Sequence, residues 1–267
     1  MSFLQLENKN IVLFGLSNKK SIASHIAQVL IREKANVIPV VRSQNARSAI
    51  EKLFPEIPVF HCDVENEEDI LKVKEKIKKD YPVIHGLIHS IAFADYSKGP
   101  KPFHETLKKD FLRSLDISCF SFIQIANHFK QILDPDASVV VLSISSTSMA
   151  SENYGFMAPV KAALESSVGF LAKSFSAFSR IRFNAVKAGL LKTKSSAGIP
   201  DYVNNYLYAE QLTLRKQALK TEEVANAVVF LLSPASSGMN ASGLVIDGGM
   251  SVNYFDRQII DKVMKNG

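Results

Sequence analysis

The sequence predicts an α/β fold in which one doubly wound parallel sheet of about seven strands carries helices on both faces. Three observations predict it. Short apolar runs, such as 139–141, alternate along the chain with longer segments whose apolar residues recur with helical period. The 267 residues are 46% hydrophobic, which is enough for a large buried core. No internal repeat, low-complexity segment or linker interrupts the alternation, so we expect a single domain over residues 1–267.

The expected strands and helices follow one another along the chain. Strands are expected at 10–14, 36–41, 58–61, 83–90, 138–144, 182–187 and 243–247. Helices are expected at 21–32, 46–53, 67–79, 111–133, from about 157 to about 178 and at 221–232, with a helical excursion over 193–216. Pro39 is unusual inside the second strand, because proline cannot donate to a strand ladder. This alternation predicts a Rossmann-type sheet, whose ligands bind at the carboxyl ends of the strands.

Two of the helices carry recognisable start signals. Asn66 stands directly before an acidic first turn, and we expect it to be the N-cap of the charged helix 67–79. In helix 221–232, Thr221 precedes Glu222 and Glu223 and is expected to cap the helix. Both starts place acidic charge where the helix dipole favours it.

Composition narrows the class of protein. Lys and Arg number 32 against 26 Asp and Glu, a net charge of +6, which fits an anionic cofactor or an acidic partner and fits an ordinary solvated surface equally well. No basic stripe interleaved with aromatic residues indicates nucleic acid, and no apolar run reaches the ~18 residues of a membrane span. Cys62 and Cys119 form neither a disulfide framework nor a metal-ligand spacing. With no secretory signal, these features predict a cytoplasmic enzyme without a metal site.

The turn after the first strand is a candidate dinucleotide site. Such a site needs backbone amides at a helix N-terminus and glycine where the backbone approaches the pyrophosphate. Only Gly15 is present, so the GxGxxG pattern is absent. The alternative is a plain turn with Ser21 as an N-cap, and that arrangement would still face an anion.

Other strand ends offer further nucleotide contacts. Arg42 follows the second strand where many NAD sites have an acid, and it could face a 2′-phosphate or be merely solvated. Asp63 could accept from the adenine amino group or be tied to nearby backbone amides. His89 is expected to be a structural hydrogen-bonding residue. The small residues that follow it, such as Ser90 and Ala92, would let the backbone approach the nicotinamide ribose.

Tyr154 and Lys161 form the central chemical pair. Pro159 is tolerated only in the first turn of a helix, so the helix begins near 157 and Tyr154 lies on the loop before it. Helical side chains lean toward the N-terminus, which directs Lys161 back toward Tyr154. We expect the phenol and the ammonium to converge on one ligand. A partly buried tyrosine with a snorkelling lysine is the alternative.

With its flanking motifs, this region resembles the short-chain dehydrogenase/reductase superfamily and, more narrowly, the bacterial enoyl-acyl-carrier-protein reductases of fatty acid synthesis. In that family six residues separate tyrosine and lysine, as they do here. The resemblance extends over essentially the whole chain. The matching segments are Gly15 with Ser21-Ile22-Ala23, Cys62-Asp63-Val64, His89-Ser90-Ile91 with Phe93-Ala94, Asn153-Tyr154 with Met157 and Lys161, 182–185, Ala188-Gly189, Thr193 and 247–249.

The resemblance implies reduction of the C2–C3 double bond of enoyl thioesters by NADH or NADPH. Tyr154 would stabilise the enolate formed on hydride transfer to C3, and Lys161 would bind the nicotinamide ribose. The expected cofactor-binding residues are Gly15, Ser21, Ile22, Arg42, Asp63, Val64, Ser90, Ile91, Ala92, Lys161, Gly189, Leu191 and Thr193. The expected substrate contacts are Ala94, Tyr154, Met157, Ile199, Tyr202 and Tyr206. The last three lie in a segment, 193–210, that would cover the acyl chain or be an ordinary amphipathic helix.

The chain departs from the family pattern at three positions. Ile144 stands where the family has a second tyrosine, ten residues before the catalytic one, and Lys187 and Leu190 replace a small residue and a proline. These changes keep two alternatives open: a short-chain reductase of a ketone or another enone, and a nucleotide-binding paralogue with weakened catalysis.

The resemblance also implies partners. The substrate would arrive on an acidic acyl carrier protein, and family members of this type are usually homotetramers packed through the helices at 111–133 and 157–178. A basic cluster near the expected covering segment is a candidate docking surface, with scattered surface cations as the alternative. It consists of Lys192, Lys194, Arg215, Lys216 and Lys220.

Overall fold

The computed structural model describes residues 3–94, 99, 101–150, 154–193, 196 and 202–265. Within these residues one parallel sheet of seven strands has the order β3-β2-β1-β4-β5-β6-β7. The strands are β1 (Asn10–Phe14), β2 (Asn36–Val41), β3 (Phe60–His61), β4 (Ile84–His89), β5 (Leu133–Ile144), β6 (Arg182–Ala188) and β7 (Ser242–Ile246). The predicted fold class is therefore confirmed.

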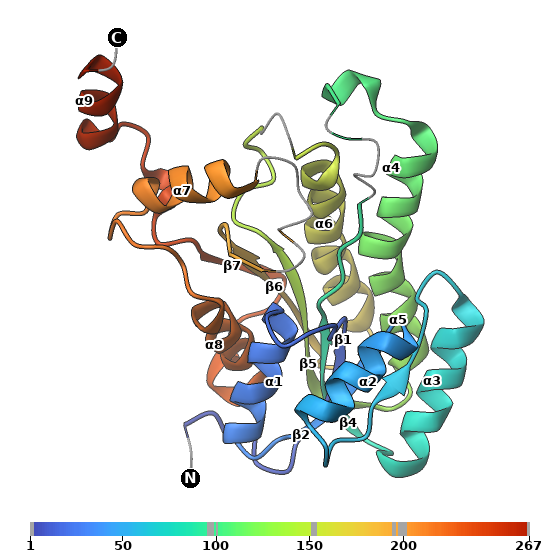
Figure 1. Cartoon of the computed structure of the whole chain (residues 1–267). Coiled ribbons are helices and arrows are strands. Elements are labelled where there is room, and N and C mark those ends of the chain that lie inside the picture. Colours follow the sequence, from blue (N-terminus) through green and yellow to red (C-terminus); the bar gives the residue numbers. More distant parts are fainter. Residues whose placement is uncertain are drawn as a thin grey trace.

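Helices cover both faces of the sheet (Figure 1). One face is covered by α1 (Ile22–Arg32), α2 (Gln44–Leu53) and α8 (Thr221–Leu232). The other is covered by α3 (Glu67–Asp80), α4 (Lys108–Leu115), α5 (Ser121–Phe129) and α6 (Met157–Phe175). The helices α7 (Tyr202–Leu212) and α9 (Arg257–Lys265) lie together at the outer end of the molecule.

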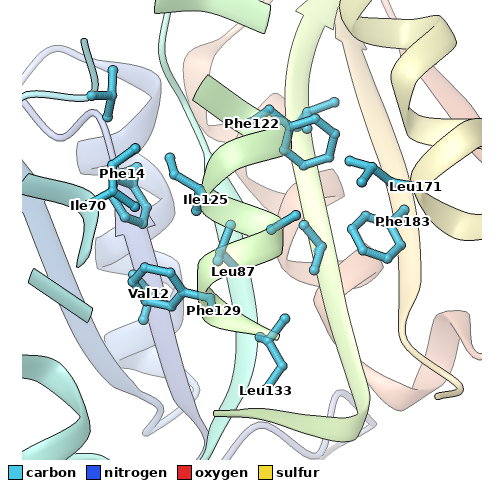
Figure 2. Packing of buried hydrophobic residues seen from close by; sticks show 14 of the residues in the cluster. Val12, Phe14, Ile70, Leu87, Phe122, Ile125, Phe129, Leu133, Leu171 and Phe183 are labelled. Atoms are coloured by element: carbon cyan, nitrogen blue, oxygen red, sulfur yellow. The ribbon is translucent and has the colours of Figure 1, made fainter. Parts of the chain in front are cut away.

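Both faces of the central strands are buried, because alternate side chains of a strand point to opposite faces. In β1, Val12 and Phe14 pack into the cluster under α3, α5 and α6, and Ile11 and Leu13 pack under α1 and α8. Figure 2 shows the first cluster, in which the rings of Phe14 and Phe129 meet edge to face with centroids 5.7 Å apart. This two-sided core fixes the strand ends that form the site.

One predicted helix, 111–133, is wrong in its extent. The chain forms α4, a π-helical turn at Asp116–Phe120 and then α5, which ends at Phe129. The helix cannot continue to residue 133, because Leu133 already pairs with Ile84 at the start of β5. The helix that follows Tyr154 likewise ends at Phe175, three residues earlier than predicted.

The helix starts match the sequence at one of the two expected caps. The Asn66 side chain accepts from the backbone N–H of Glu68 at 3.0 Å and caps α3 as predicted. In α8, however, Thr221 is the first helical residue, and Lys220 occupies the cap position. The Glu223 carboxylate accepts from the Lys220 N–H at 2.7 Å, so an acid one turn into the helix takes the role expected of Thr221.

Two features of the sheet explain its sequence. Pro39 is accommodated in β2 because β3 is short and pairs only with Val40 and Val41, which leaves no ladder bond for the proline to give. The strand order reverses between β1 and β4, and ligands of such sheets bind outside the carboxyl ends of the strands at this switch point. Among the described residues no helix is long and apolar enough to cross a membrane.

Candidate active site

A cavity of about 890 Å³ opens at the carboxyl ends of the strands. Its walls come from the segment after β4, the ends of β5 and β6, the start of α6 and one side of α7. The structure brings nine expected residues to these walls: Ile22, Ala92, Ala94, Tyr154, Met157, Gly189, Leu191, Thr193 and Tyr202. The cofactor-side and substrate-side expectations thus meet in one cavity.

Tyr154 lies in the turn directly before α6, which begins at Met157. Pro159 falls in the first turn of that helix, as its lost N–H requires. The phenol of Tyr154 is half-buried and belongs to the cavity wall. A phenol in this position can donate a hydrogen bond to an oxygen inside the cavity.

Lys161 is buried beneath the cavity and does not snorkel to the surface. Its Nζ donates to the carbonyl oxygens of Leu142, at 2.7 Å, and Ile91, at 3.3 Å. Burial lowers the pKa of the ammonium to about 8, while the nearby Glu165 partly opposes that shift. Lys161 therefore joins the ends of β5 and β4, and its third N–H is left for a ligand.

Gly15 brings the ends of β1 and β4 together. Its φ is +93°, and a Cβ at this position would lie 2.1 Å from the Ser90 carbonyl oxygen. Ser21 caps α1, since its Oγ accepts from the Ser24 N–H at 3.1 Å and donates to the Asn18 carbonyl. The side chain of Ser21 serves the helix itself, so an anion here would meet the first backbone amides of α1, beginning with Ile22.

Arg42 lies at the far end of the site among carboxylates. Its guanidinium is 3.6 Å from Asp63 and 3.3 Å from Glu65, and about half of the side chain is exposed. Arg113 holds Glu65 from the other side at 2.8 Å, and this hydrogen bond lowers the pKa of Glu65. Val64, between the two acids, is buried in the core. A 2′-phosphate at Arg42 would have to displace or share these carboxylate contacts.

The structure places His89 in a structural role. The ring is fully buried, and Nε2 lies 2.9 Å from Ser121 Oγ, which itself donates to the Ile117 carbonyl. Ser121 must therefore accept from the Nε2–H, which leaves Nδ1 unprotonated and without a partner in the described residues. Burial and the charge of Lys161 lower the pKa of His89 to about 3, so the ring is neutral at pH 7.

The helix α7 presents one face to the cavity. That face consists of Tyr202, Asn205, Tyr208, Ala209 and Leu212. Of the other two expected contacts on this segment, Tyr206 lines a separate small pocket with Glu210 and Asp247 instead, and Ile199 lies outside the described residues. The spacing of Tyr202, Asn205, Ala209 and Leu212 is helical, so the periodicity could have identified this face in the sequence.

The three departures from the family pattern lie close together. Ile144 and Leu190 give the cavity apolar wall at their positions. The Lys187 ammonium does not line the cavity and instead lies 2.9 Å from Glu165 Oε2 on α6. Lys187 thus faces the underside of α6 and not the expected place of a nicotinamide.

The basic cluster is partly neutralised by internal ion pairs. Arg215 binds Glu223 at 2.5 and 2.7 Å, and Lys216 binds Asp256. Lys194 lies outside the described residues. The exposed charge expected of this cluster is therefore smaller than the sequence suggests.

Relatives of known function match nearly the whole chain. The family model described as enoyl-(acyl carrier protein) reductase matches residues 15–251. The enoyl-(acyl-carrier-protein) reductase of the NADH type from Enterococcus faecalis is 33% identical over 246 residues, covering 92% of this chain and 98% of the relative. The NADPH-type enzyme of Staphylococcus aureus strain MRSA252 is 33% identical over 251 residues, with the same coverage.

Solved structures agree in fold. The NADH-type enoyl-(acyl-carrier-protein) reductase of Aquifex aeolicus superimposes with a TM-score of 0.89 at 25% identity, covering 94% of this chain and 99% of its own. The Bacillus cereus enzyme in complex with NADP⁺ and an indole naphthyridinone gives a TM-score of 0.86 at 30% identity, covering 92% and 98%.

Proposed function

Because the chain belongs to the enoyl-(acyl carrier protein) reductase family, we propose that it reduces the C2–C3 double bond of enoyl-acyl-carrier-protein thioesters, with NADH or NADPH as hydride donor. The observation that carries the proposal is the placement of Tyr154 on the cavity wall directly ahead of α6, with Lys161 of that helix bound beneath the same strand ends. This activity serves fatty acid synthesis.

The residues fit a nicotinamide dinucleotide. Gly15 lets the ends of β1 and β4 approach at the switch point of the sheet, and the first amides of α1 face an incoming pyrophosphate. The remaining N–H of Lys161 would hold a ribose hydroxyl, and Gly189, Leu191 and Thr193 would line the nicotinamide side. When bound, the reduced nicotinamide supplies the hydride.

The protein's own part in the reaction is to stabilise charge and exclude water. Tyr154 donates a hydrogen bond to the thioester carbonyl oxygen, which becomes the enolate oxygen when C3 is reduced. The buried ammonium of Lys161 adds a positive charge beneath it. The apolar side chains of Ile144 and Met157, together with the inner face of α7, keep the acyl chain out of water.

The sheet, the helices on it and the α7 region form one catalytic domain in this proposal, with the segment around α7 covering the acyl chain. The dinucleotide is NADH or NADPH. Arg42 supports NADPH, because its guanidinium stands where a 2′-phosphate would lie, whereas Asp63 and Glu65 beside it favour unphosphorylated ribose.

The assembly and location follow the same proposal. Exposed apolar side chains lie on the outer side of α4, the π-helical turn and α6, among them Leu112, Phe120 and Phe170. A homotetramer packed through these helices would cover them. Acyl carrier protein would deliver the substrate in the cytoplasm, a location consistent with two buried free cysteines.

One assay tests the proposed function. NADH and NADPH oxidation is measured with a crotonyl thioester and, separately, with a β-ketoacyl thioester. We expect turnover with the crotonyl substrate. Turnover with the ketone alone would establish instead the second candidate, a short-chain ketone reductase, which Ile144 favours by removing a phenol from the enolate side. Tight nucleotide binding without any turnover would indicate a binding protein.

A further inference from the structure

A cluster of charged and polar groups under α6 lies outside the roles assigned so far. Ser143 and Lys187 are direct neighbours in register on β5 and β6, on the sheet face that α6 covers. Glu165 of α6 receives both of them. Ser143 Oγ donates to Glu165 Oε1 at 2.5 Å, and Lys187 Nζ lies 2.9 Å from Glu165 Oε2.

This ion pair is built into the fold. The side chains of Lys187 and Glu165 are only 21% and 18% exposed, which distinguishes them from the exposed pairs elsewhere on the chain. The stem of Lys187 runs across β7 at Gly243, where a Cβ would lie 2.7 Å from Lys187 Cδ. The absence of a side chain at Gly243 therefore makes the room that Lys187 needs.

Glu165 stands between two cations. Lys161 lies one turn earlier on the same helix, where residues four apart are neighbours, and Lys187 lies across the interface with the sheet. Both carboxylate oxygens of Glu165 are bound on the side of Ser143 and Lys187. The Lys161 ammonium is bound only to neutral backbone carbonyls.

The other titratable groups near Lys161 carry no negative charge. His89 from β4 is a neutral ring. Burial raises the pKa of the Cys119 thiol on the π-helical turn, so this group stays protonated. Counting Lys161, Glu165 and Lys187, the cluster carries a net charge of +1, and without Lys187 it would carry none.

We propose that Lys187 is a positioning residue that engages Glu165, so that the charge of Lys161 remains uncompensated for an anion in the cavity and the Ser143 hydroxyl stays fixed at the cavity wall. The identity of that anion, an enolate, rests on the proposed function. The effect on Lys161 does not depend on the thioester. Lys187 thus acts through Glu165 without touching substrate.

The test replaces Lys187 by methionine, which keeps the stem and removes the charge. Lys173→Met, an exposed lysine on the same helix, is the matched control. The first measurement is NADH affinity against pH, which reports protonation of Lys161. In the unaltered chain affinity falls as pH rises through about 8, since Lys161 loses its charge there. In Lys187→Met the midpoint moves up by about one pH unit, because a released Glu165 stabilises the ammonium.

Two further variants assign the pathway. Glu165→Gln moves the midpoint down, and the double variant Lys187→Met/Glu165→Gln has the midpoint of Glu165→Gln alone. In the second measurement, crotonyl-thioester turnover at pH 7, we expect kcat of Lys187→Met to fall about tenfold, while the KM for NADH changes little and Lys173→Met behaves as the unaltered chain.

Three outcomes would overturn the proposal. An unmoved midpoint with a lower melting temperature would make the ion pair merely structural. A shift that persists in the Glu165→Gln background would show that Lys187 acts without Glu165. An unchanged kcat in Lys187→Met would remove its link to the reaction. Failure of the unaltered chain to reduce crotonyl thioester would overturn the proposed function instead, and the midpoints for NADH would still decide the role of Lys187.

Discussion

The phenol of Tyr202 makes two hydrogen bonds to the backbone of Leu191: it accepts from the N–H at 2.9 Å and donates to the carbonyl oxygen at 2.7 Å. Burial raises the pKa of this phenol, so it remains a donor through neutral pH. Tyr202 thereby ties the start of α7 to the segment after β6, and both line the cavity.

Removing that tie should loosen the cover over the acyl chain. We expect Tyr202→Phe to raise the KM for the enoyl thioester about tenfold through loss of the two bonds, with a smaller effect on the KM for NADH. Steady-state kinetics with both substrates varied measures this. Tyr254→Phe, which changes an 88% exposed residue, is the control. Equal losses for thioester and nucleotide would contradict the assignment of α7 to the acyl chain.

The hydroxyl of Tyr154 is expected to act in the transition state and not in nucleotide binding. Tyr154→Phe keeps the ring in the cavity wall and removes the donor, so kcat should fall by about 10²–10³-fold, as for other oxyanion donors. The dissociation constant for NADH, followed by nucleotide fluorescence, should stay within about twofold. Retained activity would show that another group stabilises the enolate.

Arg42 should discriminate between the two nucleotides. In Arg42→Ala, a lost contact to the 2′-phosphate should weaken NADPH binding about tenfold and leave NADH binding nearly unchanged. Glu65→Gln should do the opposite, because it removes a carboxylate 3.3 Å from the guanidinium. Arg47→Ala, an exposed helix arginine paired with Glu51, controls for net charge. If NADPH binds Arg42→Ala unchanged, the phosphate lies elsewhere.

Gly15 should tolerate no side chain. A Cβ would overlap the Ser90 carbonyl at 2.1 Å, and the φ of +93° adds backbone strain. Gly15→Ala should lower the free energy of unfolding by about 2 kcal/mol or more and weaken NADH binding. Urea denaturation and nucleotide titration measure both. Gly169→Ala, in open space on α6, should have neither effect.

His89 should make the fold sensitive to acid. Its folded pKa of about 3 lies below its ordinary value of 6.5, so the unfolded chain binds the extra proton between these values. Its contribution to stability is therefore lost as pH falls from 6.5 toward 3. In His89→Phe, the free energy of unfolding should decline less between pH 7 and pH 5. His104→Gln, an exposed histidine, should decline as the unaltered chain does.

Much of the fold could be predicted because local sequence and burial agree. The alternation in β1 places Ile11 and Leu13 on one face and Val12 and Phe14 on the other, as two buried faces require. The break in the helix after Lys108 could not be predicted. It accompanies hydrogen bonds between Ser118 and the backbone of Phe93, 25 residues earlier in the chain.

The candidate site divides in the same way. The position of Tyr154 before α6 followed from Pro159, a local constraint. The partner of Lys187 did not, because Glu165 lies on another element and the two meet only when α6 packs on the sheet. Tyr206 illustrates a similar limit. Helical spacing places it near Tyr202, but α7 divides its residues between two pockets.

The wide turn at Asp116–Phe120 makes the number of residues there as important as their identity. A π-helical turn accommodates one more residue than an α-helical turn. Deleting a single residue would let the helix run straight and would rotate α4 by about 100° relative to α5. Ser118 would then turn away from Phe93, whose neighbours line the cavity. In a gene library, single-codon deletions in this stretch should be depleted more strongly than substitutions at its exposed position Phe120.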